Sequence, residues 1–481
     1  YCQERYFSPE DCFIKRKSRL HCITNYTCEG ELELQKRTVS GIMLTLVLIG
    51  MLTLAFNIRP VKAGIITVPD DYPTIQEAIN NADEEDTIYV KPGTYYESFV
   101  VNKSVSLIGE AKTTTIIEGS GYMDTVVTVE ANNCTLSGFT VQNGFWGITL
   151  YSSNGSHITN NIVRSNVING VLGDHASHNK VTHNIFSHNL GAVYLSASDY
   201  NLIANNGVDR WNDGGVGLAF GSDHNWIVNN TLVESGISIH HSDNNTVTNN
   251  RVTNCWSGII LEGARFNDLL YNNVSGCWGG IALDHAGVNK IVGNILRYNG
   301  HGIHMFPWSW YNTIYHNNLV ENTLQAVIED WSLYNSWNNS CPSGGNYWSD
   351  YAGVDDYSGP YQNITGSDGI GDTPYVIDAN NRDNYPLMAP WTPLPRTIGG
   401  LKTKIEEQSS QGEIDNHGIV KSLLAKLNVA QKLVDKGKID EAKSILEEDF
   451  ITQVQNLSGI HITPEAADIL IQSAEYIVSH L

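Results

Sequence analysis

Proton-transferring side chains recur at a fixed interval in the middle of this sequence. Glu262 follows His240 by 22 residues, and Asp284 follows Glu262 by another 22. If the chain winds into coils of that length, the three side chains stack in one column at about 5 Å per coil, the spacing of hydrogen-bonded strands. Two carboxylates about 5 Å apart suit a retaining glycosidase, in which one is the nucleophile and the other the acid. The candidate catalytic residues are therefore Glu262, Asp284, His240 and the adjacent His285.

The same count places further polar and aromatic side chains in or beside this column. The column contains Tyr151, Asp174, Ser196, Ala219, His240, Glu262, Asp284, Phe306 and Asp330, with His175, His241 and His285 beside it. Trp256 and Trp278 stack just upstream, and Trp308 and Trp310 follow. Indole faces can cover the apolar faces of pyranose rings, so tryptophans beside acids are typical of sugar-binding surfaces. The candidate substrate-binding residues are Trp256, Trp278, Asp174, His241, His304, Trp308 and Asp330.

Several functions remain open for this flank. A glycoside hydrolase would use the carboxylate pair. A polysaccharide lyase would need a base and a cation that neutralises a uronate, and Arg265 or bound calcium could supply that charge. A binding protein would hold the sugar without reaction, and an ordinary solvated face would carry the same charges with no ligand. We expect glycan binding, with a polysaccharide-degrading enzyme as the alternative and a structural surface-coat role as the third.

These columns require a coiled chain, and the stretch from Asn132 to Asn335 repeats itself every 20 to 24 residues. One asparagine series comprises Asn160-Asn161, Asn184, Asn205-Asn206, Asn229-Asn230, Asn249-Asn250, Asn272-Asn273, Asn294 and Asn317-Asn318. A second comprises Asn179, Asn201, Asn225, Asn245, Asn267, Asn289, Asn312 and Asn335. Small-then-apolar steps recur in register, as at Gly258-Ile259 and Gly280-Ile281. Periods of this length are typical of solenoids.

One unit, Asn245 to Phe266, contains three short runs with alternating apolar residues, separated by Asn or Gly. Each run predicts a short strand, with Val247, Val252, Ile259 and Leu261 pointing inward. Asparagine tolerates the left-handed conformation of a sharp corner and can bond to the same amide one coil away. A leucine-rich repeat would need more leucines at fixed offsets, and a helical repeat is disfavoured by the Gly and Asn content. The sequence predicts an all-β solenoid, a right-handed parallel β-helix.

Composition and the chain ends limit the partners and the compartment. With 29 Lys and Arg against 51 Asp and Glu, the net charge is −22, which disfavours nucleic acid or an anionic membrane as partner. Residues 36–63 carry Lys36-Arg37, an apolar run and Val61-Lys62-Ala63, a pattern typical of an export signal. An uncleaved anchor is the alternative. Residues 1–35 precede that signal and are interpreted as a mis-extended gene start, although their four cysteines could form a disulfide or metal knuckle.

Four cysteines follow the signal: Cys134, Cys255, Cys277 and Cys341. Cys255 and Cys277 lie 22 residues apart and should occupy neighbouring coils, within disulfide range. A plain stack of two thiols fits the same spacing. Nine Asn-x-Ser/Thr sites in this part of the chain permit glycosylation.

The two ends of the solenoid differ in composition from the repeats. An amphipathic helix over Tyr72 to Ala82 is expected to cover one open end. Near the other end, Asp350, Asp355, Asp356, Asp368 and Asp372 crowd a Gly-rich loop, a composition that could bind calcium or form an uncoordinated acidic loop. Helical periodicity over Val420–Lys436, Ile439–Leu457 and Pro464–His480 predicts a three-helix module.

Particular motifs also carry a resemblance to known families. The residues DYPTIQEAINNA, DTIYVKPGTYYESFVV and VSLIG near the first coils resemble the opening of the pectin-lyase-like superfamily, which includes NosD-like proteins with carbohydrate-binding and sugar-hydrolase repeats. GGNYWSDY, SDGIGDTPY and DNYPLM resemble the closing segment of NosD-like archaeal surface proteins. The helical pattern resembles the FIMAH-type domain of extracellular proteins. The resemblance implies a β-helix outside the cytoplasm, a polysaccharide partner, NosD-like copper delivery as a further alternative, and attachment to a surface protein through the helices.

The expected organisation follows from these observations. It comprises a mis-extended start (1–35), a signal peptide (36–63), an N-terminal cap with the first coils (64–130), regular repeats (131–339), an acidic closing segment (340–390), a linker (391–417) and the three-helix module (418–481). We expect an extracellular or cell-surface protein with a glycan partner and no nucleic-acid partner. Calcium is the only cofactor that the sequence suggests.

Overall fold

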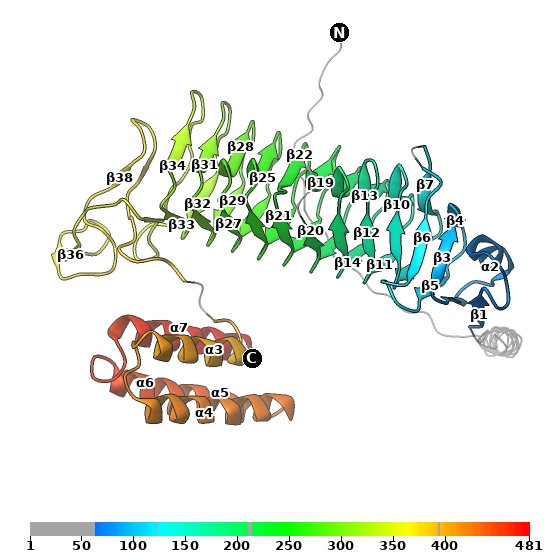
Figure 1. Cartoon of the computed structure of the whole chain (residues 1–481). Coiled ribbons are helices and arrows are strands. Elements are labelled where there is room, and N and C mark those ends of the chain that lie inside the picture. The colour runs from blue at the N-terminus through cyan, green and yellow to red at the C-terminus, as the bar shows by residue number, and fades with distance from the viewer. Residues whose placement is uncertain (1–62, 122, 210–213, 393–394) are drawn as a thin grey trace, which may run out of the picture. The chain divides into compact units, whose positions relative to one another are not determined.

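A computed structural model describes residues 63–121, 123–209, 214–392 and 395–481. The predicted gene start (1–35) and all but the last residue of the predicted signal peptide (36–63) lie outside the described residues. Residues 65–328 form a solenoid of about 12 turns, and a region of several helices follows it (Figure 1). The predicted β-helix is confirmed.

Three parallel sheets make the walls of the solenoid, and each complete coil between its two ends contributes one strand to each wall. Sheet 1 contains β1 (Ile65–Val68), β2 (Thr87–Val90), β5 (Ser106–Gly109), β8 (Thr135–Ser137), β11 (His157–Thr159), β14 (Lys180–Thr182), β17 (Leu202–Ala204), β20 (Trp226–Val228), β23 (Thr246–Thr248), β26 (Asp268–Leu270), β29 (Lys290–Val292) and β32 (Thr313–Tyr315). Sheet 2 contains β3 (Gly93–Tyr96), β6 (Thr115–Glu118), β9 (Thr140–Gln142), β12 (Ile162–Arg164), β15 (Ile185–Ser187), β18 (Gly207–Val208), β21 (Thr231–Val233), β24 (Arg251–Thr253), β27 (Asn273–Ser275), β30 (Ile295–Arg297), β33 (Asn318–Val320) and β35 (Tyr347–Trp348).

Sheet 3 has most of the longest strands and positions the candidate site. It contains β4 (Phe99–Val101), β7 (Thr125–Val129), β10 (Trp146–Tyr151), β13 (Asn169–Asp174), β16 (Gly191–Ser196), β19 (Gly214–Ala219), β22 (Ile237–His240), β25 (Ser257–Glu262), β28 (Gly279–Asp284), β31 (His301–Met305) and β34 (Leu324–Ile328). Successive side chains of a strand point to opposite faces, so one face lines the core and the other faces outward. Val247, Val252, Ile259 and Leu261 are fully buried, as predicted.

Columns of asparagine hold the corners, because each buried amide satisfies backbone groups of the neighbouring coils. Asn250 Nδ2 donates to Ile227 O at 2.8 Å, and Asn250 Oδ1 accepts from the backbone N–H of Asn230 at 2.9 Å. Asn250 Nδ2 also donates to Asn272 Oδ1 at 3.0 Å. The exposed partner of the pair, Asn249, has φ of 56°, the left-handed conformation that the corner was predicted to need. Both predicted asparagine series therefore form ladders along the solenoid.

A short helix covers the first coil. Helix α2 (Ile75–Asn81) buries Ile75, Ala78 and Ile79, and lies at one end of the solenoid (Figure 1). It begins later than the predicted Tyr72, because Thr74 is the N-cap: its hydroxyl accepts from the backbone N–H of Glu77 at 3.1 Å. Pro73 also disfavours helical backbone at Tyr72. The capping role of this helix holds.

The acidic segment closes the other end with two small antiparallel hairpins rather than another coil. One hairpin pairs β36 (Tyr357–Ser358) with β37 (Ile364–Thr365), and the other pairs β38 (Tyr375–Val376) with β39 (Arg382–Asp383). Trp337, which precedes this segment, and Trp348, which lies within it on β35, are buried as part of the solenoid core. Aromatic side chains thus fill the open end that a missing coil would leave exposed.

The helical region begins inside the predicted linker, so the linker boundary at 391–417 is wrong. Its elements are α3 (Ile398–Ser410), α4 (His417–Asp435), α5 (Ile439–Ser444), the π-helical turn η1 (Ile445–Ile451), α6 (Thr452–Leu457) and α7 (Pro464–His480). Elements α5, η1 and α6 run on continuously and correspond to the second predicted helix. Helix α3 is the additional one, since Ile398, Leu401 and Ile405 pack into the core of this region. Within the described residues, no helix is long and apolar enough to span a membrane.

Candidate functional site

The outer face of sheet 3 brings together most of the residues predicted for the site. The strands run in register, so His240 pairs with Glu262, and Glu262 pairs with Asp284. These side chains occupy the ends of β22, β25 and β28, where each strand leaves the sheet. We call this edge the acid edge. Residues that precede the same strands, including Trp256 and Trp278, form the opposite tryptophan edge.

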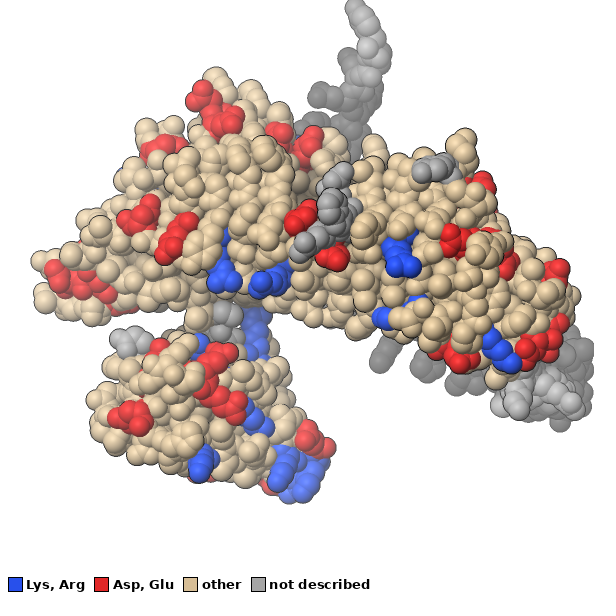
Figure 2. Space-filling model, in the orientation of Figure 1, with Lys and Arg blue, Asp and Glu red and all other residues tan. Residues whose placement is uncertain are grey.

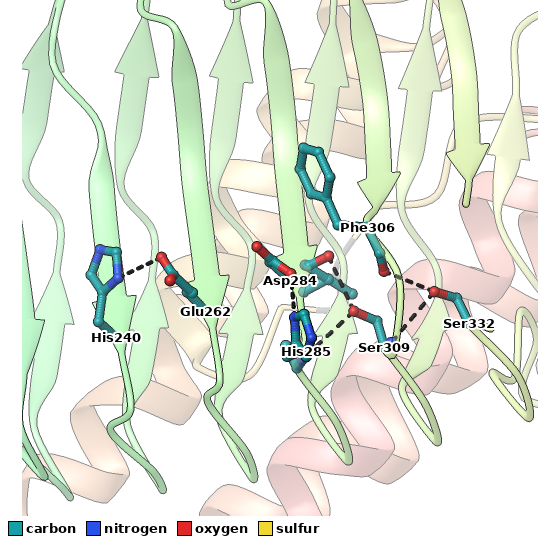
Figure 3. A network of polar contacts seen from close by, with 9 residues as sticks. His240, Glu262, Asp284, His285, Phe306, Ser309 and Ser332 are labelled. Atoms are coloured by element: carbon teal, nitrogen blue, oxygen red, sulfur yellow. Dashed lines mark hydrogen bonds and ion pairs between the residues drawn. The ribbon is translucent and has the colours of Figure 1, made fainter. Parts of the chain in front are cut away.

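Carboxylates and imidazoles pair along the acid edge (Figure 3). His240 Nδ1 lies 2.8 Å from Glu262 Oε2, and His285 Nδ1 lies 2.6 Å from Asp284 Oδ1. All four side chains are 34 to 60% exposed, so they are open to a ligand. The four predicted catalytic residues are therefore neighbours, and each carboxylate has its own imidazole partner. Such pairs can exchange protons or orient hydroxyl groups.

Two further predicted residues lie along the same edge. Asp174, at the end of β13, pairs with His175 at 2.9 Å and repeats the arrangement of Asp284 and His285. Four strands separate β13 from β28, which places Asp174 about 24 Å from Asp284 at the usual strand spacing. His241 packs its ring against Gly263, where a Cβ atom would come within 2.4 Å of the imidazole. A larger residue at position 263 would displace the His241 ring and would be strained by the φ of 60°.

Across the strands, the tryptophan edge presents a flat aromatic surface. The rings of Trp256 and Trp278 stack with centroids 4.8 Å apart and planes 4° from parallel. Trp256 is 73% exposed and Trp278 is 39% exposed. The predicted stack is confirmed, but it does not adjoin the carboxylates. Trp256 precedes Glu262 by six residues, which corresponds to about 20 Å along an extended strand.

A pocket of about 380 Å³ opens beside Trp256. Its walls include the Trp256 indole and Glu234, and its floor includes Gly236, Ser238 and Ile260. Glu234 was not among the predicted residues. It belongs to no column of acids, and the structure shows that it lines the same pocket as Trp256.

A cluster of histidine side chains lies on sheet 3 at β31, two coils after the strand that follows Trp256. His304 is almost fully buried, and its Nε2 lies 3.0 Å from Glu329 Oε1. Its Nδ1 lies 3.3 Å from His301 Nδ1, and Trp278 packs against both imidazoles. Burial, followed by the proximity of His304, lowers the pKa of His301. His304 is therefore positioned by contacts on both ring nitrogens.

The pairing of β31 with β34 corrects the predicted position of Asp330. Met305 pairs with Ile328, so Phe306 is followed in the column by Glu329, and Asp330 falls one position out of register. The assignment of Asp330 to the column is therefore wrong. The coil of β34 lacks the Gly-Ile step of the earlier coils, and Ala326 rather than Val327 pairs with Ile303.

Trp308 also stacks, but with a partner that the sequence pattern did not indicate. Its ring lies 5.6 Å from that of Trp331 on the next coil, with the planes 9° apart. Both rings are well exposed. They follow sheet 3 on the side of the acid edge, so aromatic surface flanks both edges of the sheet. Trp310, in contrast, packs beneath Arg265, whose guanidinium carbon lies 5.8 Å from the ring centroid.

The described strands of sheet 3 carry acidic side chains but no Lys or Arg. Among the described strands of sheet 3, β4 to β34, none contains Lys or Arg, whereas Asp174, Glu262 and Asp284 are acidic. Figure 2 shows acidic side chains along the whole solenoid face that it draws, with fewer basic side chains between them. An anionic ligand would therefore meet like charges on the outer face of sheet 3.

The aspartates of the closing segment act mainly as acceptors for backbone N–H groups. Asp355 accepts from Asp368 and Gly369, and Asp372 accepts from Asp356 and Tyr357. Asp350 accepts from the hydroxyl of Tyr375. In the described part of the chain, no three His, Cys, Asp or Glu side chains gather as ligands for one ion. Calcium binding at Asp350, Asp355, Asp356, Asp368 and Asp372 stays a prediction.

Comparison with known proteins places two regions in described families. Residues 79–235 and 210–353, together more than half of the chain, match the family described as periplasmic copper-binding protein (NosD). Residues 398–479 match the FIMAH domain. That second match begins at the first residue of α3, in agreement with the helical boundary seen in the structure.

One curated relative is a cell surface glycoprotein of Methanothermus fervidus, 30% identical over 136 residues. The match covers 28% of this chain and 22% of that protein. Similar solved structures include the A-module of the mannuronan C-5 epimerase AlgE6 from Azotobacter vinelandii, at a TM-score of 0.45 and 14% identity, covering 55% of this chain and 92% of that one. An alginate lyase from Paenibacillus matches at a TM-score of 0.38 and 12% identity, over 57% of this chain and 98% of the other.

Proposed function

The chain belongs to the NosD family of parallel β-helix proteins and ends in a FIMAH domain, and we propose that it binds a polysaccharide across the outer face of sheet 3. The observation that carries the proposal is the pocket beside Trp256. An exposed indole forms one wall, and the carboxylate of Glu234 and hydroxyl of Ser238 lie in the same pocket. Saccharides need this combination, because a pyranose presents an apolar face and a rim of hydroxyl groups.

The length of the face suits a polymer rather than a single sugar. About 20 Å separate Trp256 from Glu262 along one strand, and the acid edge continues over several coils. A chain that crosses sheet 3 would stack on the tryptophan edge and donate hydroxyl protons to the carboxylates of the acid edge. Each carboxylate can accept several hydrogen bonds.

The charge of the face favours a neutral glycan. A polyuronate would bring one carboxylate per sugar against Asp174, Glu262 and Asp284, with no Lys or Arg in the described strands of sheet 3 to offset the repulsion. Neutral hexoses avoid that cost. We therefore place neutral polysaccharides ahead of polyuronates as ligands.

The relatives support a location outside the cytoplasm. The matched family is described as periplasmic, and the curated relative is a cell surface glycoprotein. We propose that this chain likewise acts outside the cytoplasm, with the FIMAH domain available for a surface-protein partner.

Affinity electrophoresis tests the binding proposal. The chain is run through gels that contain one of several neutral polysaccharides or polyuronates. Retardation in a neutral polysaccharide, lost on Trp256→Ala and kept on Trp226→Ala, would support it. Trp226 is a suitable control because it is exposed on sheet 1, away from the pocket. Equal retardation of both variants would overturn the assignment to sheet 3.

Hydrolysis is the second candidate, and one observation favours it. Glu262 and Asp284 occupy neighbouring strands in register, at the spacing of a retaining carboxylate pair. In that case Asp284 or Glu262 would attack the sugar while the other protonates the leaving oxygen, and the adjoining histidines would orient them. Shortening of the polymer over time, lost on Glu262→Gln, would favour this function over binding alone.

Copper delivery is implied by the description of the matched family, and the residues present give it little support. The described chain offers two pairs of soft or nitrogen ligands, Cys255 with Cys277 and His301 with His304. Neither pair gains a third His, Cys, Asp or Glu ligand among the described residues. The donor set therefore does not fit a copper site of three or more ligands, and no step of the proposal involves copper.

A further inference from the structure

Cys255 and Cys277 interrupt a third ladder of buried corner residues. In the two coils after Cys277 this position holds asparagine, and the backbone N–H of Asn299 donates to Asn322 Oδ1 at 3.0 Å. Asparagine also holds it in earlier coils, where the N–H of Asn166 donates to Asn189 Oδ1 at 3.1 Å, and the coil directly before Cys255 has the buried Ser235. Cys277 retains the backbone hydrogen bond to the following coil, since its N–H donates to Asn299 Oδ1 at 2.9 Å. On the other side the acceptor is a sulfur, because the N–H of Cys255 donates to Cys277 Sγ at 3.3 Å.

The two cysteines are a matched pair rather than two isolated changes. They stand on adjacent rungs, and their sulfur atoms lie 2.6 Å apart. A thiol has one weak donor and a weak acceptor, whereas the asparagine amide has two N–H donors and a strong acceptor oxygen, so each replacement weakens the ladder. A covalent link between the rungs would compensate for both losses. Coil spacing also brings the two α-carbons to about 5 Å, inside the range that a disulfide requires.

From this juxtaposition we propose that Cys255 and Cys277 form a disulfide that joins neighbouring coils at the tryptophan edge. The cross-link lies immediately before Trp256 and Trp278 in each coil, so it fixes the two stacked indoles relative to each other. This inference rests on the ladder and the sulfur contact, and it holds whether or not the face binds a glycan.

Accessibility and thiol chemistry give the reaction an order. Cys255 is half-buried and lines the open pocket, whereas Cys277 is buried. The thiolate of Cys255 attacks a small-molecule disulfide, forms a mixed disulfide and releases one thiolate. Cys277 then attacks the Cys255 sulfur and releases the second. Two protein thiols lose two protons and two electrons, and one small disulfide is reduced to two thiols.

Peptide mapping tests the cross-link directly. The native full-length chain is incubated with oxidised glutathione, denatured in the presence of an alkylating reagent and digested with trypsin. Cleavage after Arg251, Arg265 and Lys290 yields peptides 252–265 and 266–290, which carry one cysteine each. We expect these two peptides to run as one cross-linked species that dithiothreitol separates. Recovery of both peptides as separate, alkylated species without reductant would overturn the proposal.

A double variant without the two cysteines serves as the control for the effect of the disulfide on stability. Cys255→Asn with Cys277→Asn restores the asparagine ladder and removes the cross-link, so that variant is expected to fold. Dithiothreitol should lower the melting temperature of the oxidised wild-type chain and leave that of the variant unchanged. Equal shifts in the two proteins would show that no disulfide at this position contributes to stability, and would count against the proposal.

Discussion

The indoles of Trp256 and Trp278 lie parallel, with centroids 4.8 Å apart, although 22 residues separate them in the chain. This distance is the coil spacing, and the same geometry stacks Trp308 on Trp331. The solenoid therefore converts a sequence period into columns of like side chains. Ligand binding and stability both depend on these columns, and each can be tested by changing one rung.

Asn250 is expected to be essential for stability. Asn250→Ala leaves the N–H of Asn230 and the carbonyl of Ile227 without their partners inside the solenoid. We expect a loss of about 3 kcal/mol or more in the free energy of unfolding, measured by urea denaturation, because each buried unsatisfied group costs about 1–3 kcal/mol.

The neighbouring corner residue supplies the control. Asn249 is exposed with φ of 56°, a conformation that glycine adopts freely. Asn249→Gly should change the free energy of unfolding by no more than about 1 kcal/mol. Similar losses in the two variants would contradict the ladder as the source of stability.

Asp383 should make the closing segment more stable in mild acid. Burial raises the pKa of its carboxyl from 3.8 to about 6, although Asn346 and Trp348 donate hydrogen bonds to it. Because the folded-state pKa exceeds the unfolded one, protonation favours the folded chain. The contribution is complete below about pH 3.8 and is lost as the pH rises through about 6.

A shift of this size corresponds to roughly 2 to 3 kcal/mol. Urea denaturation of the wild type and of Asp383→Asn at pH 4 and pH 7 measures it. The stability advantage of the wild type over the variant should shrink by that amount at the higher pH. A difference that is independent of pH would show that Asp383 does not titrate in this range.

Glu234 is expected to bind a sugar hydroxyl in the pocket. Glu234→Ala should weaken binding of a neutral polysaccharide about tenfold, the loss of one hydrogen bond to a charged group. Glu234→Gln should retain more of the affinity, since its carbonyl still accepts. Binding measured by calorimetry at low and high salt should change little, because the ligand is uncharged. Strong weakening by salt would instead point to an ionic ligand.

Glu262→Gln and Asp284→Asn separate binding from hydrolysis. If the face only binds, both variants should leave polymer length unchanged and reduce affinity modestly, because the amides still form hydrogen bonds. If it hydrolyses, polymer shortening by the wild type should fall at least 100-fold in either variant. Size-exclusion chromatography of the polysaccharide after incubation distinguishes these outcomes. His157→Ala on sheet 1 is a suitable control, since it lies on another wall.

The architecture could be predicted from the sequence because every coil repeats the same pattern of inward apolar residues and corner asparagines. Val247 and Ile259 follow the alternation that buries them, and the stack of Trp256 on Trp278 follows from equal coil lengths. The same reasoning failed at Asp330. There the coil lacks the Gly-Ile step that marks the register elsewhere, and Glu329 takes the position instead.

The residues and elements that were not predicted are those without an unbroken repeat in the sequence. Glu234 and Trp256 follow paired strands at the same corner of neighbouring coils and line one pocket, but no column of like side chains marks Glu234. The third asparagine ladder was overlooked because Cys255 and Cys277 interrupt it. Helix α3 had a readable signal in the spacing of Ile398, Leu401 and Ile405, but Gly399 and Gly400 obscured it. Local propensity was outweighed there by packing against the other helices.

The most direct test of glycan binding is the affinity of Trp256→Ala for a neutral polysaccharide, compared with that of Trp226→Ala. Removing an exposed indole that stacks on a sugar should cost about 1.4 kcal/mol or more, a factor of ten in the dissociation constant. We predict that loss for Trp256→Ala and wild-type affinity for Trp226→Ala, with both variants folded. Unchanged affinity in Trp256→Ala would contradict the outer face of sheet 3 as the binding surface.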